Sequence, residues 1–169
     1  KNCQLVNFTG PSLIFSNGGN NSLIQNNNVS SFIVGVNPAV GFEISRTDNV
    51  TIEGNSVNSS LTDPMGVNIR DSTNVTVRNN TFHTLDVGIN FAGTRVTWNV
   101  SSSGNIYRRA NRAISFGTGA TFLNVTIRDE NVSGNATRSY SLSSSDGNFS
   151  IRFINTSVSS TQPILINSA

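Results

Sequence analysis

The 169-residue chain has few of the residues that cross-link a protein or charge its surface. Cys3 is the single cysteine, so no disulfide can form within the chain. Only 12% of residues are charged, against about 25% in a typical domain, and a net charge of +2 is too small to indicate a nucleic-acid partner. No apolar run approaches the roughly 18 residues of a membrane span. No signal peptide is recognisable at the start, so any targeting or anchoring segment would lie outside this chain.

Neutral hydrogen-bonding side chains supply most of the polarity, with 26 Asn, 25 Ser and 16 Thr. Hydrophobic residues make up 36% of the chain, which is long enough to bury a sizeable core. Disordered chains, in contrast, usually carry high charge. We therefore predict one ordered domain over residues 1–169, either a segment of a larger chain or a subunit that stacks on others.

A repeat of roughly 25 residues runs along the chain. One column of tetrads is typified by NVTI at 49–52 and NVTV at 74–77, with Arg95-Val-Thr-Trp98 as its fifth member. It alternates with a second column typified by GINF at 88–91. Apolar and polar residues alternate within the tetrads, which indicates strands with one buried face, and no helical period competes. Equivalent strands can stack in parallel about 4.8 Å apart. The prediction is an all-β fold, a single-stranded parallel β-helix (β-solenoid) of about seven coils.

The alternation also predicts which side chains face the core. In the first column these are Val50, Ile52, Val75, Val77, Val125, Ile127, Phe149, Ile151 and, in the fifth coil, Trp98. In the second column they are Phe42, Ile44, Val67, Ile69, Ile89, Phe91, Ile114, Phe116, Ile164 and Ile166.

An asparagine follows the first strand in several coils, at Asn27, Asn55 and Asn80. Asparagine tolerates the left-handed backbone of a sharp corner, and stacked amides can hydrogen-bond from coil to coil as a ladder. Glu130 takes this position in the sixth coil, and the fifth coil departs from the pattern around Asn99. We therefore expect the ladder to break in the second half of the chain.

The asparagine-punctuated pattern of NVTIEGNSV and NVTVRNNTF resembles the parallel β-helix repeats of the pectin-lyase-like superfamily and of archaeal and bacterial surface proteins. The resemblance implies a right-handed helix, in agreement with the handedness of parallel crossovers. It does not select a function, because that superfamily includes lyases, hydrolases, phage tailspikes, adhesins and structural proteins.

The motifs of the enzymes with this fold are missing. The glycosidases that the chain resembles use Asn-Thr-Asp, Asp-Asp and Gly-His-Gly, whereas the stretch from Arg46 to Asn49 scrambles the first motif and the other two are absent. The acidic residues are scattered, so no calcium ligand set stands out. We therefore predict that the chain is not an enzyme, with no catalytic residue, cofactor or metal.

One basic turn is a candidate ligand site. Tyr107, Arg108, Arg109 and Arg112 lie within six residues, and arginine offers a planar fork to carboxylate or sulfate groups. The turn could therefore bind an acidic polysaccharide. The alternative is a solvated turn without a ligand.

Asn-X-Ser/Thr sequons are more frequent than composition predicts. Multiplying 26 Asn by the Ser/Thr fraction of 41/169 gives about six, whereas thirteen occur. They begin at Asn7, Asn20, Asn28, Asn49, Asn58, Asn74, Asn79, Asn99, Asn124, Asn131, Asn135, Asn148 and Asn155. Occupied sequons would place the protein outside a eukaryotic or archaeal cell, whereas a bacterial or phage protein would carry them without glycans.

These observations favour an extracellular, N-glycosylated structural β-solenoid of a cell-surface fibre, sheath or filament. The repeat fills the chain, so copies are expected to stack end to end and to form an open filament. The alternatives are a glycan-binding adhesin or tailspike segment, and a non-catalytic fragment of a polysaccharide lyase or hydrolase. No membrane span and no nucleic-acid partner are expected for this chain.

Overall fold

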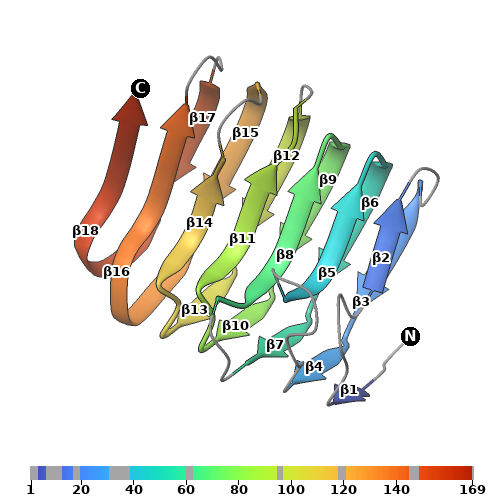
Figure 1. Cartoon of the computed structure of the whole chain (residues 1–169), viewed down its shortest axis with the longest axis horizontal. Helices are drawn as coiled ribbons and strands as arrows, with labels where there is room; N and C mark the ends of the chain where they lie inside the picture. Colours follow the sequence, from blue (N-terminus) through green and yellow to red (C-terminus); the bar gives the residue numbers. More distant parts are fainter. Residues whose placement is uncertain are drawn as a thin grey trace.

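The computed structural model shows a parallel β-helix whose coils stack along the long axis of the molecule (Figure 1). It describes residues 4–6, 13–16, 20–30, 39–59, 63–94, 97–117, 121–144 and 149–168. Every pair of neighbouring strands within this part of the chain is parallel, as the sequence predicted. None of the described segments is a helix long and apolar enough to span a membrane.

Each coil contributes strands to three sides of the helix. The first side is a six-stranded sheet of β3 (Ser22–Gln25), β6 (Asp48–Glu53), β9 (Thr73–Arg78), β12 (Thr97–Ser103), β15 (Phe122–Arg128) and β17 (Phe149–Ile154). The second side has short strands, β1 (Gln4–Val6), β4 (Asn28–Ser30), β7 (Ser56–Asn58), β10 (Thr81–His83) and β13 (Ile106–Arg108). The third side is formed by β2 (Leu13–Ser16), β5 (Val40–Ser45), β8 (Met65–Arg70), β11 (Val87–Ala92) and β14 (Arg112–Phe116).

The second and third sides join at the C-terminal end of the helix. There β16 (Asn131–Ser144) pairs with both β13 and β14, and β18 (Ser157–Ser168) pairs with β16. Five complete turns separate β3 from β17, so the number of complete turns is below the predicted seven. The strands β1 and β2 before them, and β18 after them, belong to further coils.

The core consists of stacked columns of aliphatic and aromatic side chains, because the same register repeats from coil to coil. Val50 pairs with Val75, and both are fully buried as predicted. Phe91 stacks on Phe116 with ring centroids 4.7 Å apart. Aromatic pairs of this kind add to the stabilisation from buried area. Ile164 in the final strand was predicted to face the core but is 50% exposed, since no described strand lies beyond β18. The predictions for Phe149 and Ile166 fall outside the side chains that the structure describes.

A row of glycines at the start of the third-side strands lets aromatic rings pack against the backbone. A Cβ atom added to Gly66 would lie 2.5 Å from the ring of Phe82 and 2.5 Å from the carbonyl oxygen of Gly88. A Cβ atom on Gly88 would lie 2.5 Å from the ring of Tyr107. Glycine is therefore required here by close approach.

The fifth coil has a different register from the one predicted. Val100 pairs with Val125, and Ser101 pairs with Thr76. The fifth tetrad is therefore Asn99-Val-Ser-Ser and not Arg95-Val-Thr-Trp. Trp98 pairs with Thr73, whereas Ser102 pairs with Val77, so the predicted alignment of Trp98 with Val77 is wrong.

Candidate functional site

An inner ladder of asparagines runs along the corner between the first and second sides. The Nδ2 atom of Asn27 donates to Oδ1 of Asn55 at 2.9 Å, Asn55 donates in the same way to Asn80 at 3.0 Å, and Asn80 to Asn105 at 3.0 Å. Each accepting Oδ1 also binds the backbone N–H of the donor residue. The predicted ladder is confirmed, and its buried amides satisfy backbone groups at every corner.

Two details of the predicted corner are wrong. The ladder does not break at the fifth coil, because Asn105 continues it there and donates to Glu130 in the sixth coil. The left-handed backbone also lies one residue earlier than predicted, at Asn26, Gly54 and Asn79, with φ of 54°, 65° and 54°. The residue before each ladder asparagine therefore adopts the left-handed conformation that turns the corner. The amide of the ladder asparagine can then point inward.

Glu130 ends the inner ladder with a carboxyl group, and the residue is only 1% exposed. Its Oε1 accepts from Oγ of Ser102 at 2.6 Å and from Nδ2 of Asn105 at 3.0 Å, and its Oε2 accepts the backbone N–H of Asn105 at 2.9 Å. Burial raises the pKa of Glu130 to about 7, although these hydrogen bonds act in the opposite direction. Ser102 occupies a core position that holds Val77 in the preceding coil. A serine therefore replaces a core valine, a glutamate replaces a ladder asparagine, and the two replacements are joined by a hydrogen bond.

A second, outer ladder lies on the surface at the start of the first-side strands. Nδ2 of Asn49 donates to Oδ1 of Asn21 at 2.7 Å, Asn99 donates to Asn74 at 3.0 Å, and Asn124 to Asn99 at 2.7 Å. All five asparagines have φ between 52° and 56°, a left-handed conformation that asparagine adopts more readily than most residues. The outer ladder was not predicted, although the repeated Asn of the NVT tetrads was visible.

Asp48 joins this outer ladder between the second and third rungs. It accepts from Oγ1 of Thr73 at 2.6 Å and from Nδ2 of Asn74 at 2.7 Å. The hydrogen bond from Thr73, followed by that from Asn74, lowers the pKa of the Asp48 carboxyl group. The carboxylate therefore replaces an asparagine oxygen as the acceptor in this coil.

The four residues of the predicted glycan-binding turn do not form one surface. Tyr107 is fully buried and stacks on Phe82 with centroids 5.2 Å apart, so its inclusion among surface residues was wrong. Arg108 and Arg109 are exposed. Arg112 forms an ion pair and hydrogen bond with Asp86 of the preceding coil.

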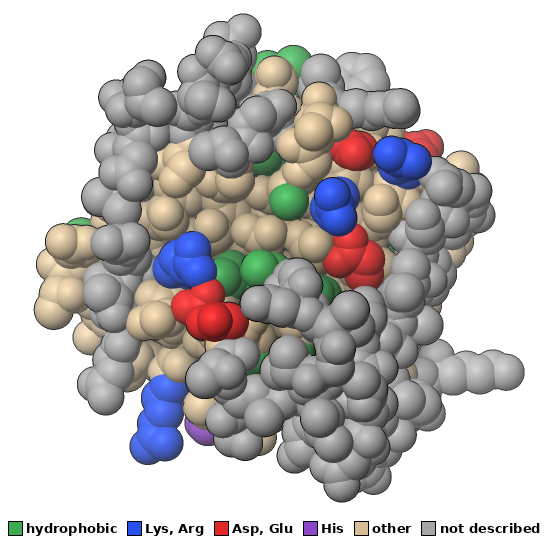
Figure 2. All heavy atoms as spheres, viewed as in Figure 1, with side chains coloured by type: hydrophobic (Ala, Val, Ile, Leu, Met, Phe, Trp, Pro, Cys, Tyr) green, Lys and Arg blue, Asp and Glu red, His purple; other side chains and the backbone are tan. Residues whose placement is uncertain are grey.

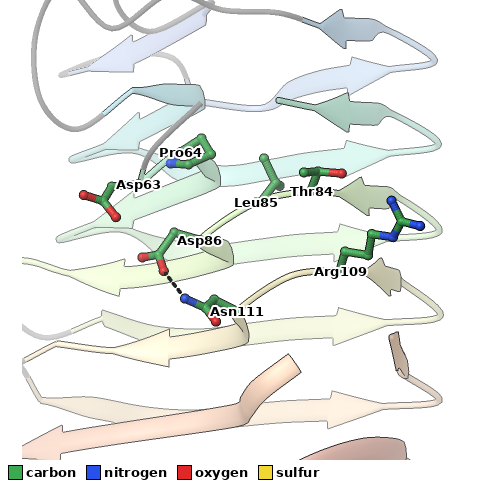
Figure 3. Close-up of a pocket in the computed structure, with 7 residues that line it drawn as sticks. All are labelled: Asp63, Pro64, Thr84, Leu85, Asp86, Arg109 and Asn111. Carbon is green, nitrogen blue, oxygen red and sulfur yellow. Dashed lines mark hydrogen bonds between the residues drawn. The ribbon is translucent and has the colours of Figure 1, made fainter. Parts of the chain in front are cut away.

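Arg109 lines a surface hollow of about 210 Å³ between the second and third sides. Figure 3 shows Thr84 and Arg109 at one end of the hollow and Asp63 and Asp86 at the other. The lining is completed by Pro64, Leu85 and Asn111. The hollow therefore offers an arginine to an anionic group and carboxylates to hydroxyl groups of one ligand.

Asp86 is fixed in position by the next coil. Its Oδ1 accepts from Nδ2 of Asn111 at 3.1 Å, and its Oδ2 accepts from Arg112. Asp63 reaches the same hollow from the preceding coil and has φ of 56°. The sequence did not point to this pair of carboxylates, because Asp63 and Asp86 are 23 residues apart and share no motif.

Charged side chains elsewhere on the surface also pair across coils. Arg78 donates to Glu53 at 2.9 Å, and Arg70 lies 4.0 Å from Glu43. Figure 2 shows basic and acidic side chains side by side on the face toward the viewer, without a large patch of one sign. Burial raises the pKa of Glu43, against the effects of Asn68 and Arg70.

Every sequon asparagine with a described side chain is exposed. The ten are Asn20, Asn28, Asn49, Asn58, Asn74, Asn79, Asn99, Asn124, Asn131 and Asn155. The other three predicted sites, Asn7, Asn135 and Asn148, lie outside the residues whose side chains the structure describes. Within the described residues, no group of three or more His, Cys, Asp or Glu could hold a metal ion.

A family model described as "right handed beta helix region" matches residues 1–158. The chain belongs to this right-handed β-helix family. The predicted right-handed parallel β-helix and its resemblance to pectin-lyase-like proteins are thereby confirmed. No curated protein sequence matches the chain significantly.

Two solved structures are similar to the chain at low identity. A candidate glycosyl hydrolase from Parabacteroides merdae is 14% identical, with a TM-score of 0.45, over 91% of this chain and 82% of that chain. The endo-xylogalacturonan hydrolase from Aspergillus tubingensis is also 14% identical, with a TM-score of 0.40, over 98% of this chain and 75% of that chain.

The prediction that the chain is not an enzyme is corrected by these neighbours, which are hydrolases by name. The missing motifs are therefore no ground for excluding catalysis. At 14% identity and TM-scores of 0.45 and 0.40, no activity passes from either neighbour to this chain.

Proposed function

We propose that the chain is an extracellular, N-glycosylated β-helix that forms the rigid body of a cell-surface fibre, sheath or filament. The observation that carries the proposal is the exposure of all ten sequon asparagines with described side chains. Glycans need acceptors at the surface, and a fold with half of these positions buried would have argued against them. The two ladders and the continuous core support the structural role, because they link every coil to the next.

Intact-mass analysis of protein from its native source tests this proposal. The unmodified chain has a mass of 18.0 kDa. Glycosylated material should be heavier by several glycans and should return to the mass of the bare chain, apart from the conversion of glycosylated Asn to Asp, after enzymatic removal of N-glycans. Native protein with the mass of the bare chain would refute it.

A second candidate function is the binding of an acidic polysaccharide at the Arg109 hollow. It is favoured by the opposed placement of Arg109 and the two carboxylates of Asp63 and Asp86 (Figure 3). An acidic polysaccharide could place the carboxylate of one sugar against Arg109 and sugar hydroxyl groups against Asp63 and Asp86.

A glycan array with three proteins tests the second candidate. Arg109→Ala should abolish binding to uronic-acid polymers, whereas the wild type should retain it. Arg152→Ala is the matched control, since Arg152 is an exposed arginine on β17, outside the hollow. Equal binding by all three proteins, or no binding by the wild type, would rule out the hollow as a polysaccharide site.

Assembly through the ends of the helix completes the proposal. Ile151, Phe153 and Val158 pack against the core but are only partly buried in the last described strands. A first coil of a second copy would cover such side chains, and repetition of this head-to-tail contact gives a filament. Light scattering across a concentration series should show growing species. A monomer at all concentrations would refute end-to-end assembly.

A further inference from the structure

The described sequons fall into two geometric classes. Four of them, at Asn49, Asn74, Asn99 and Asn124, lie in the outer ladder, where each asparagine stacks directly on the next. The other six, which we call the isolated sequons, do not stack on one another and are Asn20, Asn28, Asn58, Asn79, Asn131 and Asn155.

In the outer ladder the nitrogen that would carry the glycan is already a donor. Nδ2 of Asn49, Asn74, Asn99 and Asn124 donates to a side-chain oxygen of the preceding coil at 2.7–3.0 Å. A sugar on Nδ2 replaces one of its two N–H bonds and needs room beside that nitrogen. Neighbouring rungs are about 4.8 Å apart, so glycans on consecutive rungs would also collide.

Lack of open surface is not what separates the two classes. A shallow hollow of about 340 Å³ lies on the first side, lined in part by Asn99 and Asn124. The difference lies in the ladder bonds, because a sugar on Nδ2 removes one of its two N–H bonds and has to fit beside the side-chain oxygen of the preceding coil that this nitrogen contacts.

The isolated sequons lack these ladder bonds, although Asn79 and Asn155 share the left-handed backbone, with φ of 54° and 48°. Within the described part of the chain, none of their Nδ2 atoms donates a hydrogen bond. The residues that pair with them in the next coil are small or different in kind, such as Ser56 opposite Asn28, His83 opposite Asn58 and Ser157 opposite Asn131. A glycan on one of them therefore meets no glycan from a neighbouring rung of its row.

We propose that the isolated sequons are the glycan acceptors of the folded protein and that the four outer-ladder asparagines remain unmodified as structural residues. The inference rests on the proposed N-glycosylation. The transfer forms a bond from C1 of the first sugar to Nδ2 and breaks the bond from C1 to the diphosphate of a lipid-linked oligosaccharide. The amide loses one proton, and the lipid diphosphate leaves. Chains modified in the ladder would fail to fold and would be absent from the secreted protein.

Glycopeptide mass spectrometry of the folded protein, secreted from a eukaryotic host, tests the inference. Glycans are expected on the isolated sequons, and peptides with Asn49, Asn74, Asn99 and Asn124 should be unmodified. Glycans on both classes would overturn this inference and leave the proposed glycoprotein intact. Folded protein without any glycan would overturn both.

Three variants separate glycan acceptance from the ladder bonds. Asn58→Gln should lose the mass of one glycan. Thr76→Ala destroys the sequon at Asn74 but keeps its amide, so both the glycan mass and the melting temperature should match the wild type. Asn74→Gln should also keep the glycan mass but lower the melting temperature, because it disrupts the ladder. Loss of one glycan in Thr76→Ala would refute the assignment.

Discussion

Replacement of Glu130 by glutamine should remove a pH dependence of stability that arises at the end of the inner ladder. The pKa of Glu130 is raised from 4.5 to about 7 in the folded state, so between these values the folded chain binds more protons than the unfolded chain. Stability therefore falls as pH rises across this window. Since one pKa unit corresponds to about 1.4 kcal/mol, the loss is about 3 kcal/mol between pH 4.5 and 7.5.

The measurement is the free energy of unfolding in urea at pH 4.5, 5.5, 6.5 and 7.5 for wild type and Glu130→Gln. A glutamine carbonyl can still accept hydrogen bonds from Ser102 and Asn105, and it cannot ionise. The wild type should lose stability relative to the variant as pH rises. Comparison with the variant is needed because two other carboxyl groups also make stability depend on pH. The raised pKa of Glu43 lowers stability as pH rises, as that of Glu130 does, and the lowered pKa of Asp48 acts in the opposite direction.

Glu53→Gln is the matched control, because Glu53 is a partly exposed glutamate that pairs with an arginine on the surface. Glu53→Gln should lose stability between pH 4.5 and 7.5 as the wild type does, whereas Glu130→Gln should not show this loss. A constant difference between wild type and Glu130→Gln at all four pH values would refute the reasoning, because it would show that folding does not raise the pKa of Glu130.

Three further changes test the faces, the ladder and the glycine row, each by urea unfolding. Val75→Asp should unfold the protein, because a charge in the buried column costs several kcal/mol. Thr76→Asp on the outer face should change stability by about 0.5 kcal/mol or less. Equal effects of the two changes would refute the assignment of the buried and outer faces. Asn80→Ala should lower the free energy of unfolding by about 2–4 kcal/mol, because it leaves buried polar groups unsatisfied. Asn74→Ala, at an exposed position, should lower it by about 1 kcal/mol. The reverse order would refute the expectation that the inner ladder contributes more to stability than the outer ladder. Gly66→Ala should cost about 1–3 kcal/mol through overpacking against the ring of Phe82 and the carbonyl oxygen of Gly88, and a neutral effect would show that both the ring and the neighbouring backbone can move.

The fold could be predicted from the sequence because its signals are local and repeated. Alternation within each tetrad marks strands and their buried face, and the repeat of about 25 residues requires parallel stacking. The same reasoning placed Val75 and Ile89 in the core and Asn55 and Asn80 in a ladder, and the structure confirms these positions. Sequon positions could also be predicted, since a sequon is a local motif.

Only the tertiary structure decided the features that depend on neighbouring coils. Ser102 and Glu130 each break the repeat alone, and only their 2.6 Å hydrogen bond shows that they compensate for each other. The hollow joins Asp63 and Asp86 from different coils, and the core takes Tyr107 away from the surface. Local periodicity determines which way a strand faces, whereas contacts between coils depend on register, and one irregular coil is enough to shift the register beyond what a sequence pattern can show.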